Sequence, residues 1–166
     1  MKWDEIENEV CSVSRTLAVV GDRWTMLIIR DAFLRVRRFD DFQKNLGMSR
    51  HRLSERLKKL VEYGVLRKEA YQANRYEYRL TEKGLELYPI LISMAKWGDK
   101  WMDDGKGVPM LYKHNTCGKH YKPVVVCSEC GEPIDPHDVT PEIGPGKFAS
   151  SRAHSALHHV LKSAGK

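Results

Sequence analysis

The sequence of 166 residues lacks long hydrophobic runs and lacks any pattern that identifies a catalytic site. No segment approaches the roughly 20 apolar residues that a membrane-spanning helix needs, and the opening MKWDEIENEV is too polar and acidic for a secretory signal. There is no P-loop, no dinucleotide-binding glycine pattern and no nucleophile with a recognisable base. We therefore expect a cytoplasmic protein that has no membrane partner and is not an enzyme.

Cysteine is also scarce, and the chain contains four: Cys11, Cys117, Cys127 and Cys130. Because thiols stay reduced in the cytoplasm, metal binding, redox chemistry or simple packing explains them better than a disulfide framework does. The hydrophobic share of 42% and the charged share of 30% are those of an ordinary globular protein.

Negative charge is sparse between Arg35 and Lys68, where eleven Lys and Arg residues stand against four Asp and Glu. This local surplus of seven positive charges exceeds the net charge of +6 of the whole chain. A positive field concentrated in one place indicates a polyanionic partner, and it favours nucleic acid over an anionic membrane surface. A solvated charged face without a partner is the alternative.

The spacing of apolar residues predicts a series of helices in the first half of the chain. They cover residues 12–21, 22–34, 37–47 and 50–63. Asp22 and Ser49 are suited to cap the second and fourth helices, and Gly47 closes the third because glycine enters the left-handed conformation at little cost. The fourth helix has leucines on one side and arginines and lysines on the other.

The hydrophobic period then becomes alternating, which predicts a hairpin with strands over 65–71 and 75–80. Thr81 caps a long last helix that reaches Trp101 and is kinked at Pro89. A helix, a tight turn, a basic helix and a hairpin together predict a winged helix-turn-helix.

In this motif the second helix enters the major groove of DNA, and its first residues meet base edges. Arginine suits guanine because its planar fork donates to two acceptors, which is worth roughly 1–3 kcal/mol of discrimination. We therefore assign base contacts to Arg50, His51, Arg52 and Arg56. The predicted DNA interface also includes Ser49, Arg75 beside the hairpin turn, and the phosphate-binding candidates Arg37, Arg38, Lys58 and Lys59.

Several stretches in order, GDRWT, RRF, LSERLKKLVEYGVL, YRLTEKG and WGDKW, resemble the HxlR-type family of bacterial winged-helix transcriptional regulators. The resemblance covers about residues 11–101. It implies a homodimer whose interface is formed by the first and last helices of this region. It also implies binding to pseudo-palindromic operators, with half-sites about one turn of DNA, or roughly 34 Å, apart.

The resemblance gives Cys11 a further meaning, because many HxlR-like proteins have a cysteine there and some use it to sense oxidants or electrophiles. A nearby helix N-terminus or cation such as Arg15 could lower the pKa of the thiol, and oxidation could change the spacing of the two DNA-reading helices. The usual proline after this cysteine is replaced by Ser12. A small packed residue in the dimer interface is the alternative.

Two close-spaced pairs mark the region after Trp101, His114-x2-Cys117 and Cys127-x2-Cys130, and each is followed by glycine. Thiolate and imidazole pairs on tight turns are the ligands of structural zinc, so we expect a zinc site made of these four residues. His120 or His137 could replace His114 as the fourth ligand. A Cys127/Cys130 dithiol and chemically inert cysteines remain as alternatives.

The sequence as a whole predicts an α+β, mainly α protein with four parts. A short N-terminal extension (1–10) precedes the winged helix-turn-helix and dimerisation domain (11–104), a zinc-ribbon-like appendage (105–147) and a basic tail (148–166) that we expect to be frayed or disordered. The predicted partners are double-stranded DNA, a second copy of the chain, and an oxidant or small-molecule effector. A zinc or dithiol enzyme and a basic protein-interaction adaptor are the competing functions.

Overall fold

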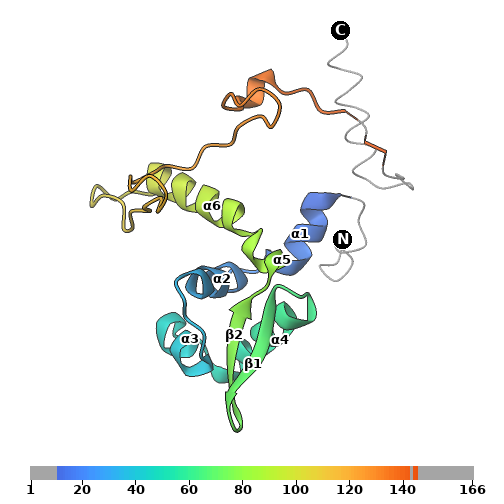
Figure 1. Ribbon diagram of the computed structural model, residues 1–166, viewed down its shortest axis with the longest axis vertical. Coiled ribbons are helices and arrows are strands. Elements are labelled where there is room, and N and C mark those ends of the chain that lie inside the picture. The colour runs from blue at the N-terminus through green and yellow to red at the C-terminus, as the bar shows by residue number, and fades with distance from the viewer. Residues whose placement is uncertain (1–10, 143, 146–166) are drawn as a thin grey trace.

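The computed structural model describes residues 11–142 and 144–145. The predicted segments 1–10 and 148–166 therefore lie outside the described residues. The described elements are α1 (Ser12–Val20), α2 (Thr25–Phe33), α3 (Phe39–Leu46), α4 (Arg50–Glu62), β1 (Leu66–Gln72), β2 (Arg75–Leu80), α5 (Glu82–Leu85), α6 (Tyr88–Trp101) and the short 3-10 helix η2 (Pro136–Asp138) (Figure 1). The described part is mainly helical, as predicted, and none of its helices is long and apolar enough to span a membrane.

The core of the protein lies where α2, α3 and α4 pack around the base of the hairpin. Its fully buried side chains are Ile28, Ile29, Phe42, Leu53, Leu57, Leu60, Val65 and Leu66. The predicted leucine stripe of α4 supplies three of them, and the fourth predicted member, Val61, packs against the cluster while half-buried. Burying one such side chain contributes about 1.5–3 kcal/mol, so this cluster fixes the orientation of α4.

The turn between α3 and α4 has the predicted chemistry. Gly47 has a φ of 62°, and the Ser49 hydroxyl oxygen accepts from the backbone N–H of Arg52 at 3.4 Å. Asp22 also acts as a cap, because its carboxylate accepts from the backbone N–H groups of Trp24 and Thr25 at 2.9 and 3.3 Å. The helix itself starts at Thr25, three residues later than predicted.

The third helix was predicted from Arg37, and this prediction is wrong at its N-terminal end. Arg38 has extended backbone angles, and α3 starts at Phe39. The backbone of this segment pairs with β2 instead: the N–H of Tyr78 donates to the carbonyl of Arg37 at 2.8 Å, and Arg38 forms a bridge with Glu77. Pairing with the hairpin satisfies backbone groups that a longer helix would have used.

The predicted hairpin is confirmed. Strands β1 and β2 are antiparallel, with Leu66 opposite Leu80 at the base and Gln72 opposite Arg75 near the turn. Asn74 takes a left-handed φ of 58° at the turn, where asparagine is well tolerated. A bulge between Ala70 and Gln72 shifts the register of the strand end.

The long helix predicted from Thr81 to Trp101 is instead two helices. The first, α5, ends at Leu85, and α6 starts at Tyr88 with Pro89 in its first turn. A proline costs little at a helix start, where its missing N–H would have no partner, so the chain breaks before Pro89 instead of kinking at it. Thr81 does cap α5, because its hydroxyl oxygen accepts from the N–H of Gly84 at 3.1 Å.

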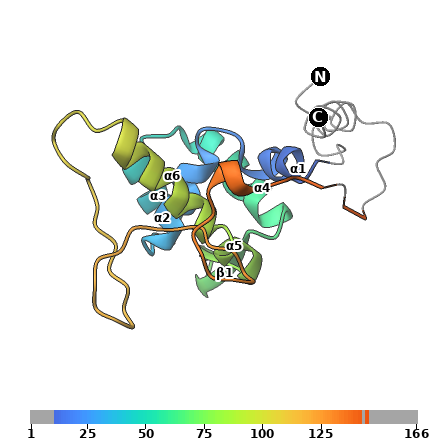
Figure 2. The ribbon, with the colours of Figure 1, turned by 90° about the horizontal axis from the view of Figure 1, so that it is seen from above.

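The segment after α6 differs from the rest of the described chain. None of the described residues from Gly105 to Pro145 is buried. Figure 1 shows them as a mostly extended trace beyond α6, and in Figure 2, seen from above, the later part of this trace passes in front of the helices. It contacts α6 through two hydrogen bonds: the hydroxyls of Tyr88 and Tyr121 lie 2.7 Å apart, and the Lys96 ammonium donates to the carbonyl of Pro123 at 2.7 Å. We call the described residues 105–142 and 144–145 the appendage.

Candidate nucleic-acid interface

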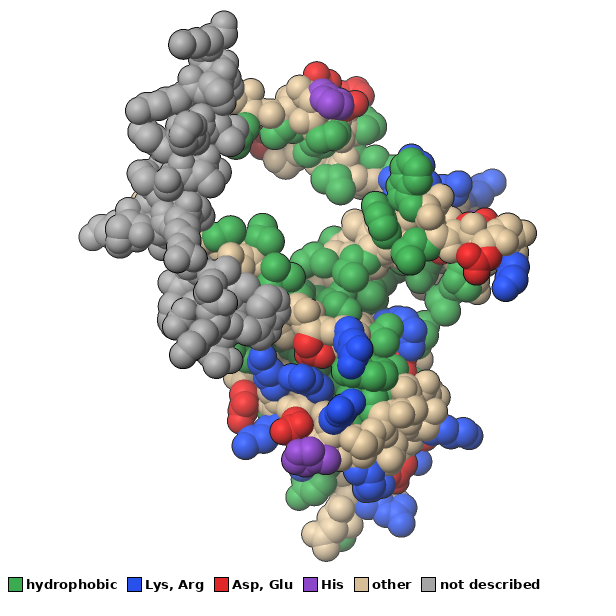
Figure 3. All heavy atoms as spheres, turned by 180° about the vertical axis from the view of Figure 1, so that it is seen from behind, with side chains coloured by type: hydrophobic (Ala, Val, Ile, Leu, Met, Phe, Trp, Pro, Cys, Tyr) green, Lys and Arg blue, Asp and Glu red, His purple; other side chains and the backbone are tan. Residues whose placement is uncertain are grey.

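The first turn of α4 presents its cations to solvent. Arg50, His51 and Arg52 are exposed, whereas Leu53 and Leu57 on the opposite side are buried in the core. Seen from behind, Lys and Arg side chains gather over the part of the molecule that contains α3, α4 and the hairpin (Figure 3). The fold therefore presents the basic surface that the charge pattern predicted.

Some of the predicted DNA-contacting residues are engaged within the chain. The guanidinium of Arg50 binds the carboxylate of Asp40 at 3.0 Å and lies over the ring of Phe39. Arg56 faces the carboxylate of Asp22 at 3.4 Å, which joins α4 to the cap of α2. Because the Arg56–Asp22 pair is partly buried, it favours a structural role for Arg56 beside the predicted base contact.

Two further side chains of α4 lie near carboxylates one turn away. Nε2 of His51 is 3.5 Å from Glu55, and the Lys58 ammonium is 3.7 Å from Glu62. An exposed helical ion pair such as Lys58–Glu62 contributes about 0.3–0.5 kcal/mol. A phosphate can therefore displace the carboxylate at little cost, so Lys58 stays available to DNA.

A different set of cations has no acidic partner among the described residues. Within the predicted interface and the hairpin, it comprises Arg37, Arg38, Arg52, Lys59, Lys68 and Arg75. Arg52 stands on the exposed side of the first turn of α4, and Lys59 lies over the ring of Tyr63. Their charge is not neutralised within the described chain, so they are the strongest candidates for contact with a polyanion.

A groove of about 500 Å³ lies between the β1–β2 hairpin, which is the wing of the motif, and the starts of α3 and α4. Arg38 lies in it with its guanidinium 4.9 Å from the centre of the Tyr71 ring, and the Lys68 ammonium is 4.1 Å from the centre of the Tyr76 ring. Arg75 also lines the groove. The attraction between a cation and an aromatic face keeps each of these two cations beside a ring that also lines the groove.

Sequence reasoning missed Lys68, Tyr71 and Tyr76 as members of this interface. Lys68 lies opposite Tyr78, and Ala70 opposite Tyr76, on the hairpin. Alternation along β1 could have placed Lys68 on the same face as Tyr76. Tyr71 could not have been found in this way, because it reaches the groove only after the bulge shifts the register.

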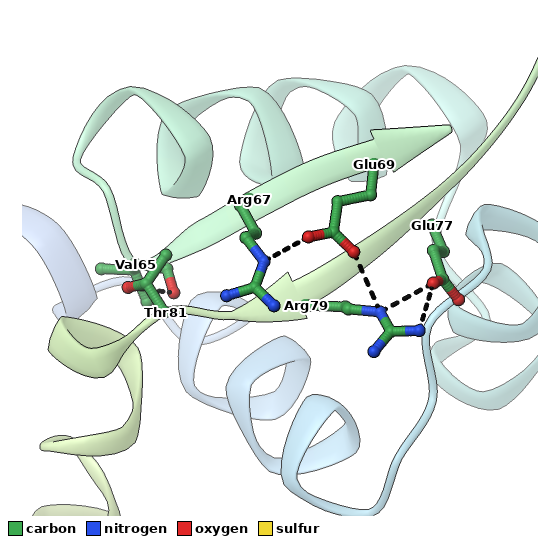
Figure 4. A network of polar contacts seen from close by, with 6 residues as sticks. All are labelled: Val65, Arg67, Glu69, Glu77, Arg79 and Thr81. Atoms are coloured by element: carbon green, nitrogen blue, oxygen red, sulfur yellow. Dashed lines mark hydrogen bonds and ion pairs between the residues drawn. The ribbon is translucent and has the colours of Figure 1, made fainter. Parts of the chain in front are cut away.

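The other face of the wing carries a neutralised ladder of charges (Figure 4). Glu69 binds Arg67 and Arg79, and Arg79 also binds Glu77, with N–O distances of 2.5 to 3.1 Å. Arg37 lines a hollow of about 240 Å³ on this side together with Arg67 and Arg79. Arg37 and Arg38 were both predicted to bind phosphates, and their side chains line different surfaces.

The end of α4 is held by the segment that follows the wing. The Thr81 hydroxyl donates to the carbonyl of Gly64 at 2.6 Å, and the Lys83 ammonium donates to the carbonyl of Tyr63 at 2.7 Å. A Cβ added to Gly84 would lie 2.2 Å from the carbonyl oxygen of Val65. Glycine is therefore required for the close approach of α5 to the end of the helix that presents the cations.

Cys11 lies directly before α1 and is half-buried. Its carbonyl accepts from the backbone N–H of Arg15 at 3.1 Å, while the Arg15 guanidinium contacts the Ser12 hydroxyl at 3.4 Å. The helix N-terminus that was predicted to activate the thiol is therefore present. The guanidinium that was predicted to assist it has a hydrogen bond to Ser12.

The two Cys/His pairs of the appendage form separate turns. In the first, the sulfur of Cys117 lies 3.4 Å from Nδ1 of His114. In the second, the backbone N–H groups of Cys130 and Glu129, and the Cys130 thiol, hydrogen-bond to Cys127 and lower the pKa of its thiol. Among the described residues no group of three or more Cys, His, Asp or Glu is placed to hold a metal ion, so the predicted four-ligand site is not assembled in this conformation.

The order of α2, α3, α4 and the hairpin is that of a winged helix-turn-helix, and the match to known proteins agrees. The HxlR-like helix-turn-helix family matches this chain over residues 19–106. The chain belongs to this family. The family confirms the predicted resemblance and makes the protein a helix-turn-helix transcriptional regulator, as its curated relatives are named.

The relatives differ in how much of the chain they match. Uncharacterised HTH-type transcriptional regulators of Mycobacterium bovis and Mycobacterium tuberculosis are 46% identical over 145 residues, which covers 84% of this chain and 92% of theirs. One from Synechocystis is 31% identical over 97 residues, covering 57% of this chain and 72% of that protein. The mycobacterial match spans about 139 residues of this chain, so it extends beyond residue 106 into the appendage.

Solved structures show the same division. The candidate transcription factor PA1607 has a TM-score of 0.75 at 35% identity, covering 82% of this chain and 96% of that one. The redox regulator HypR in its reduced form has a TM-score of 0.52 at 29% identity, covering 56% of this chain and 95% of that one. HypR therefore matches about half of the chain, whereas PA1607 also matches part of what lies beyond it.

Proposed function

We propose that this protein is a cytoplasmic transcription factor that binds a pseudo-palindromic DNA operator as a homodimer. The observation that carries the proposal is the exposed first turn of α4 next to a groove in which Arg50 binds Asp40, whereas Arg38, Lys68 and Arg75 lack acidic partners among the described residues. The competing enzyme and adaptor functions do not account for this surface, and the relatives of the chain are named as transcriptional regulators.

The geometry divides the cations between two tasks. Arg52 and His51 stand on the exposed side of the first turn of α4, where side chains of a recognition helix reach base edges in the major groove. Arg38, Lys68 and Arg75 line the groove beside the wing, where phosphates of the adjacent backbone would pass. The first set would provide sequence preference, and the second set would provide affinity and register.

The exposed apolar faces of α1 and α6 support a homodimer. Met94, Trp97 and Trp101 are 53%, 60% and 64% exposed, and they recur at helical spacing along one side of α6. Val13 on α1 is 67% exposed. Large apolar side chains gathered in this way mark an interaction surface, and a second copy would cover them and place two α4 helices on one duplex.

A selection from random DNA duplexes tests this proposal. The reduced full-length protein should enrich an inverted repeat whose half-site centres lie about one helical turn, or 10 base pairs, apart. The variant Trp97→Ser/Trp101→Ser should lose dimerisation and bind the enriched site more weakly, although its α4 is unchanged. Recovery of unrelated sequences by the wild-type protein would contradict the proposal.

That the regulator senses an oxidant through Cys11 stays a prediction. Support comes from the likeness to HypR, a redox regulator, over about half of the chain. Oxidation should change the affinity of the wild-type protein for its selected site and leave that of Cys11→Ser unchanged. Equal responses of the two proteins would exclude this cysteine as the sensor.

A small-molecule effector has a candidate site between α6 and the appendage. A pocket of about 250 Å³ lies there, and Ile92, Met110, Leu111 and Tyr112 are among its mostly apolar lining, with Lys96 and Asp99 beside them. An apolar pocket with a few polar groups suits a small amphipathic molecule. A ligand in it would act on α6, the helix proposed to form the dimer.

A further inference from the structure

The two turns of the appendage repeat the same hydrogen bonds at an offset of thirteen residues. In the first, the N–H of Gly118 donates to the carbonyl of His114 at 2.8 Å, and in the second the N–H of Gly131 donates to that of Cys127 at 2.9 Å. The flanking bonds repeat too: His114 to Lys119 and Tyr121 to Tyr112 in the first turn correspond to Cys127 to Glu132 and Ile134 to Val125 in the second.

The glycines of the two turns share one backbone conformation. Gly118 and Gly131 have φ angles of 69° and 76°, in the left-handed region where glycine is favoured. Each turn also closes a bridge between flanking residues, Lys113 with His120 and Val126 with Pro133. Two segments with different side chains thus adopt one local fold, and the shared features are the pairs of soft ligand atoms and the glycine after each pair.

This repeat distinguishes between the candidate histidines. His114 occupies the position of Cys127, and Cys117 the position of Cys130, whereas His120 corresponds to Pro133 and lies in the flanking bridge. His137 lies outside both turns, in η2. The ligand atoms of the first turn are therefore those of His114 and Cys117.

The distances within the first turn fit a metal ion. With Zn–S near 2.3 Å and Zn–N near 2.0 Å, the edge between a sulfur and a nitrogen of a zinc tetrahedron is about 3.5 Å. The Cys117 sulfur and the His114 Nδ1 are 3.4 Å apart. The pair therefore already has the separation of two ligands on one zinc ion.

The appendage has no buried core that would hold its two turns together. No described residue of it is buried, and Val124, Val125 and Ile134 remain exposed. Segments of this size need a metal, disulfides or a partner for a fixed fold. The first turn is anchored to α6 through Tyr121 and Pro123, so the exposed segment between Pro123 and Val126 is where the chain would bend to bring the second turn in.

We propose that one Zn²⁺ ion per chain joins the two turns, held by Nδ1 of His114 and the thiolates of Cys117, Cys127 and Cys130. The three thiols release their protons to solvent as the metal binds. All four positions are filled by protein ligands, so the ion is structural and leaves no open position for substrate. Bringing the two turns together on one ion would also place the exposed Val124, Val125 and Val126 between them.

Native mass spectrometry of the reduced full-length protein tests the stoichiometry. The expected result is one zinc ion per chain, with Co²⁺ as a substitute probe that shows the absorption of a tetrahedral site with thiolate ligands. A protein that stays free of metal in the presence of zinc, or that binds one ion per two chains, would overturn the proposal.

Matched histidine variants test the choice of ligand. His114→Ala should lower zinc affinity by at least about 100-fold, since loss of groups that merely support a ligand costs about 10- to 100-fold. His120→Ala, six residues away on the same turn, should retain the affinity of the wild-type protein, and so should His137→Ala. Retention of affinity by His114→Ala, with loss in either of the other two, would contradict the assignment. Because zinc affinity is measured without DNA, this test is independent of the proposed regulatory function.

Discussion

The body of the protein, residues 12–101, and the appendage are built by different means. The body has a cluster of fully buried side chains contributed by three helices and the base of the hairpin, whereas no described residue of the appendage is buried. The body holds its cations in fixed places because the core fixes α4. The two turns of the appendage are shaped mainly by backbone hydrogen bonds, with a contact between the Cys117 sulfur and Nδ1 of His114 in the first.

This difference explains where each part gets its stability. Burial of apolar side chains stabilises the body without any ligand. The appendage gains little from burial, so its proposed zinc ion has to supply most of the free energy that folds the two turns together. The three predictions that follow distinguish stabilisation by buried side chains from stabilisation by zinc, and they are given in order of decreasing expected effect.

Removal of zinc should affect the appendage and spare the body. Structural zinc sites contribute on the order of 10 kcal/mol to folding, so a chelator should abolish amide-exchange protection around Cys117 and Cys130. Protection in α2 and α4 should not change, because their core contains no metal ligand. Equal loss of protection in both regions would show that the two parts fold as one unit.

The substitution Gly84→Ala should destabilise the body. The new Cβ would lie 2.2 Å from the backbone carbonyl of Val65, which cannot move without disturbing the end of α4. Overpacking of this kind costs about 1–3 kcal/mol, measurable as a lower free energy of unfolding at a fixed chain concentration.

Gly98→Ala is the control for that substitution. A Cβ at Gly98 meets nothing within 4 Å in the described chain, and alanine favours a helix over glycine by about 0.5–1 kcal/mol. Gly98 lies near Met94 and Trp101 on the face of α6 that is proposed to dimerise, so both substitutions are compared in the Trp97→Ser/Trp101→Ser variant. There Gly98→Ala should not lower the free energy of unfolding. If Gly84→Ala behaved in the same way, the close packing of α5 against Val65 would be refuted.

The smallest effect concerns the contact between the two parts, Tyr88 with Tyr121. Burial, followed by the hydrogen bond to Tyr121, raises the pKa of Tyr88 from 10.0 to about 12. An unfolded Tyr88 loses its proton near pH 10, and the docked one keeps it to about pH 12. A Tyr88 that has lost only its hydrogen bond to Tyr121 loses its proton at a lower pH than the docked one. The stabilising free energy of the Tyr88–Tyr121 contact is therefore fully present below pH 10, and it decreases as the pH rises from 10 towards 12.

Tyr88→Phe provides the matched control, because it removes the hydroxyl and keeps the ring that packs on Phe33. At neutral pH the variant should lose about 0.5 kcal/mol of docking free energy. Amide exchange around Tyr121 should then no longer respond to pH between 10 and 12 beyond its intrinsic rate. A persistent response would place the titrating group elsewhere.

Sequence reasoning succeeded where hydrophobic periodicity decides the structure. It found the leucines of α4, the caps Asp22 and Ser49, and the hairpin, because each depends on residues close in sequence. It failed at Arg37, since pairing with β2 is a contact between distant segments. It failed again at the break before Pro89, where the same residue is compatible with a kink or a new helix.

At the DNA interface, too, sequence reasoning could not predict contacts between segments that are distant in the sequence. Charge density located the basic surface, but the sequence could not show that Asp40 and Asp22 face Arg50 and Arg56, because these pairs form only when helices pack. Spacing alone left three histidines as candidates for the fourth zinc ligand. The repeated backbone bonds, which no composition reveals, distinguish His114 from the other two.

The most direct test of DNA recognition by the body compares two variants that lose the same charge. Arg38→Gln/Arg75→Gln removes two cations that are proposed to hold phosphates, and Lys106→Gln/Lys122→Gln removes two from the appendage. The measurement is the slope of log binding constant against log salt concentration on the selected duplex. Each phosphate contact contributes a slope of about −0.9, so the first variant should flatten the slope by up to about 1.8 and the second should match the wild-type protein. Equal slopes for the two variants would contradict the central claim that the basic face of the winged body binds DNA.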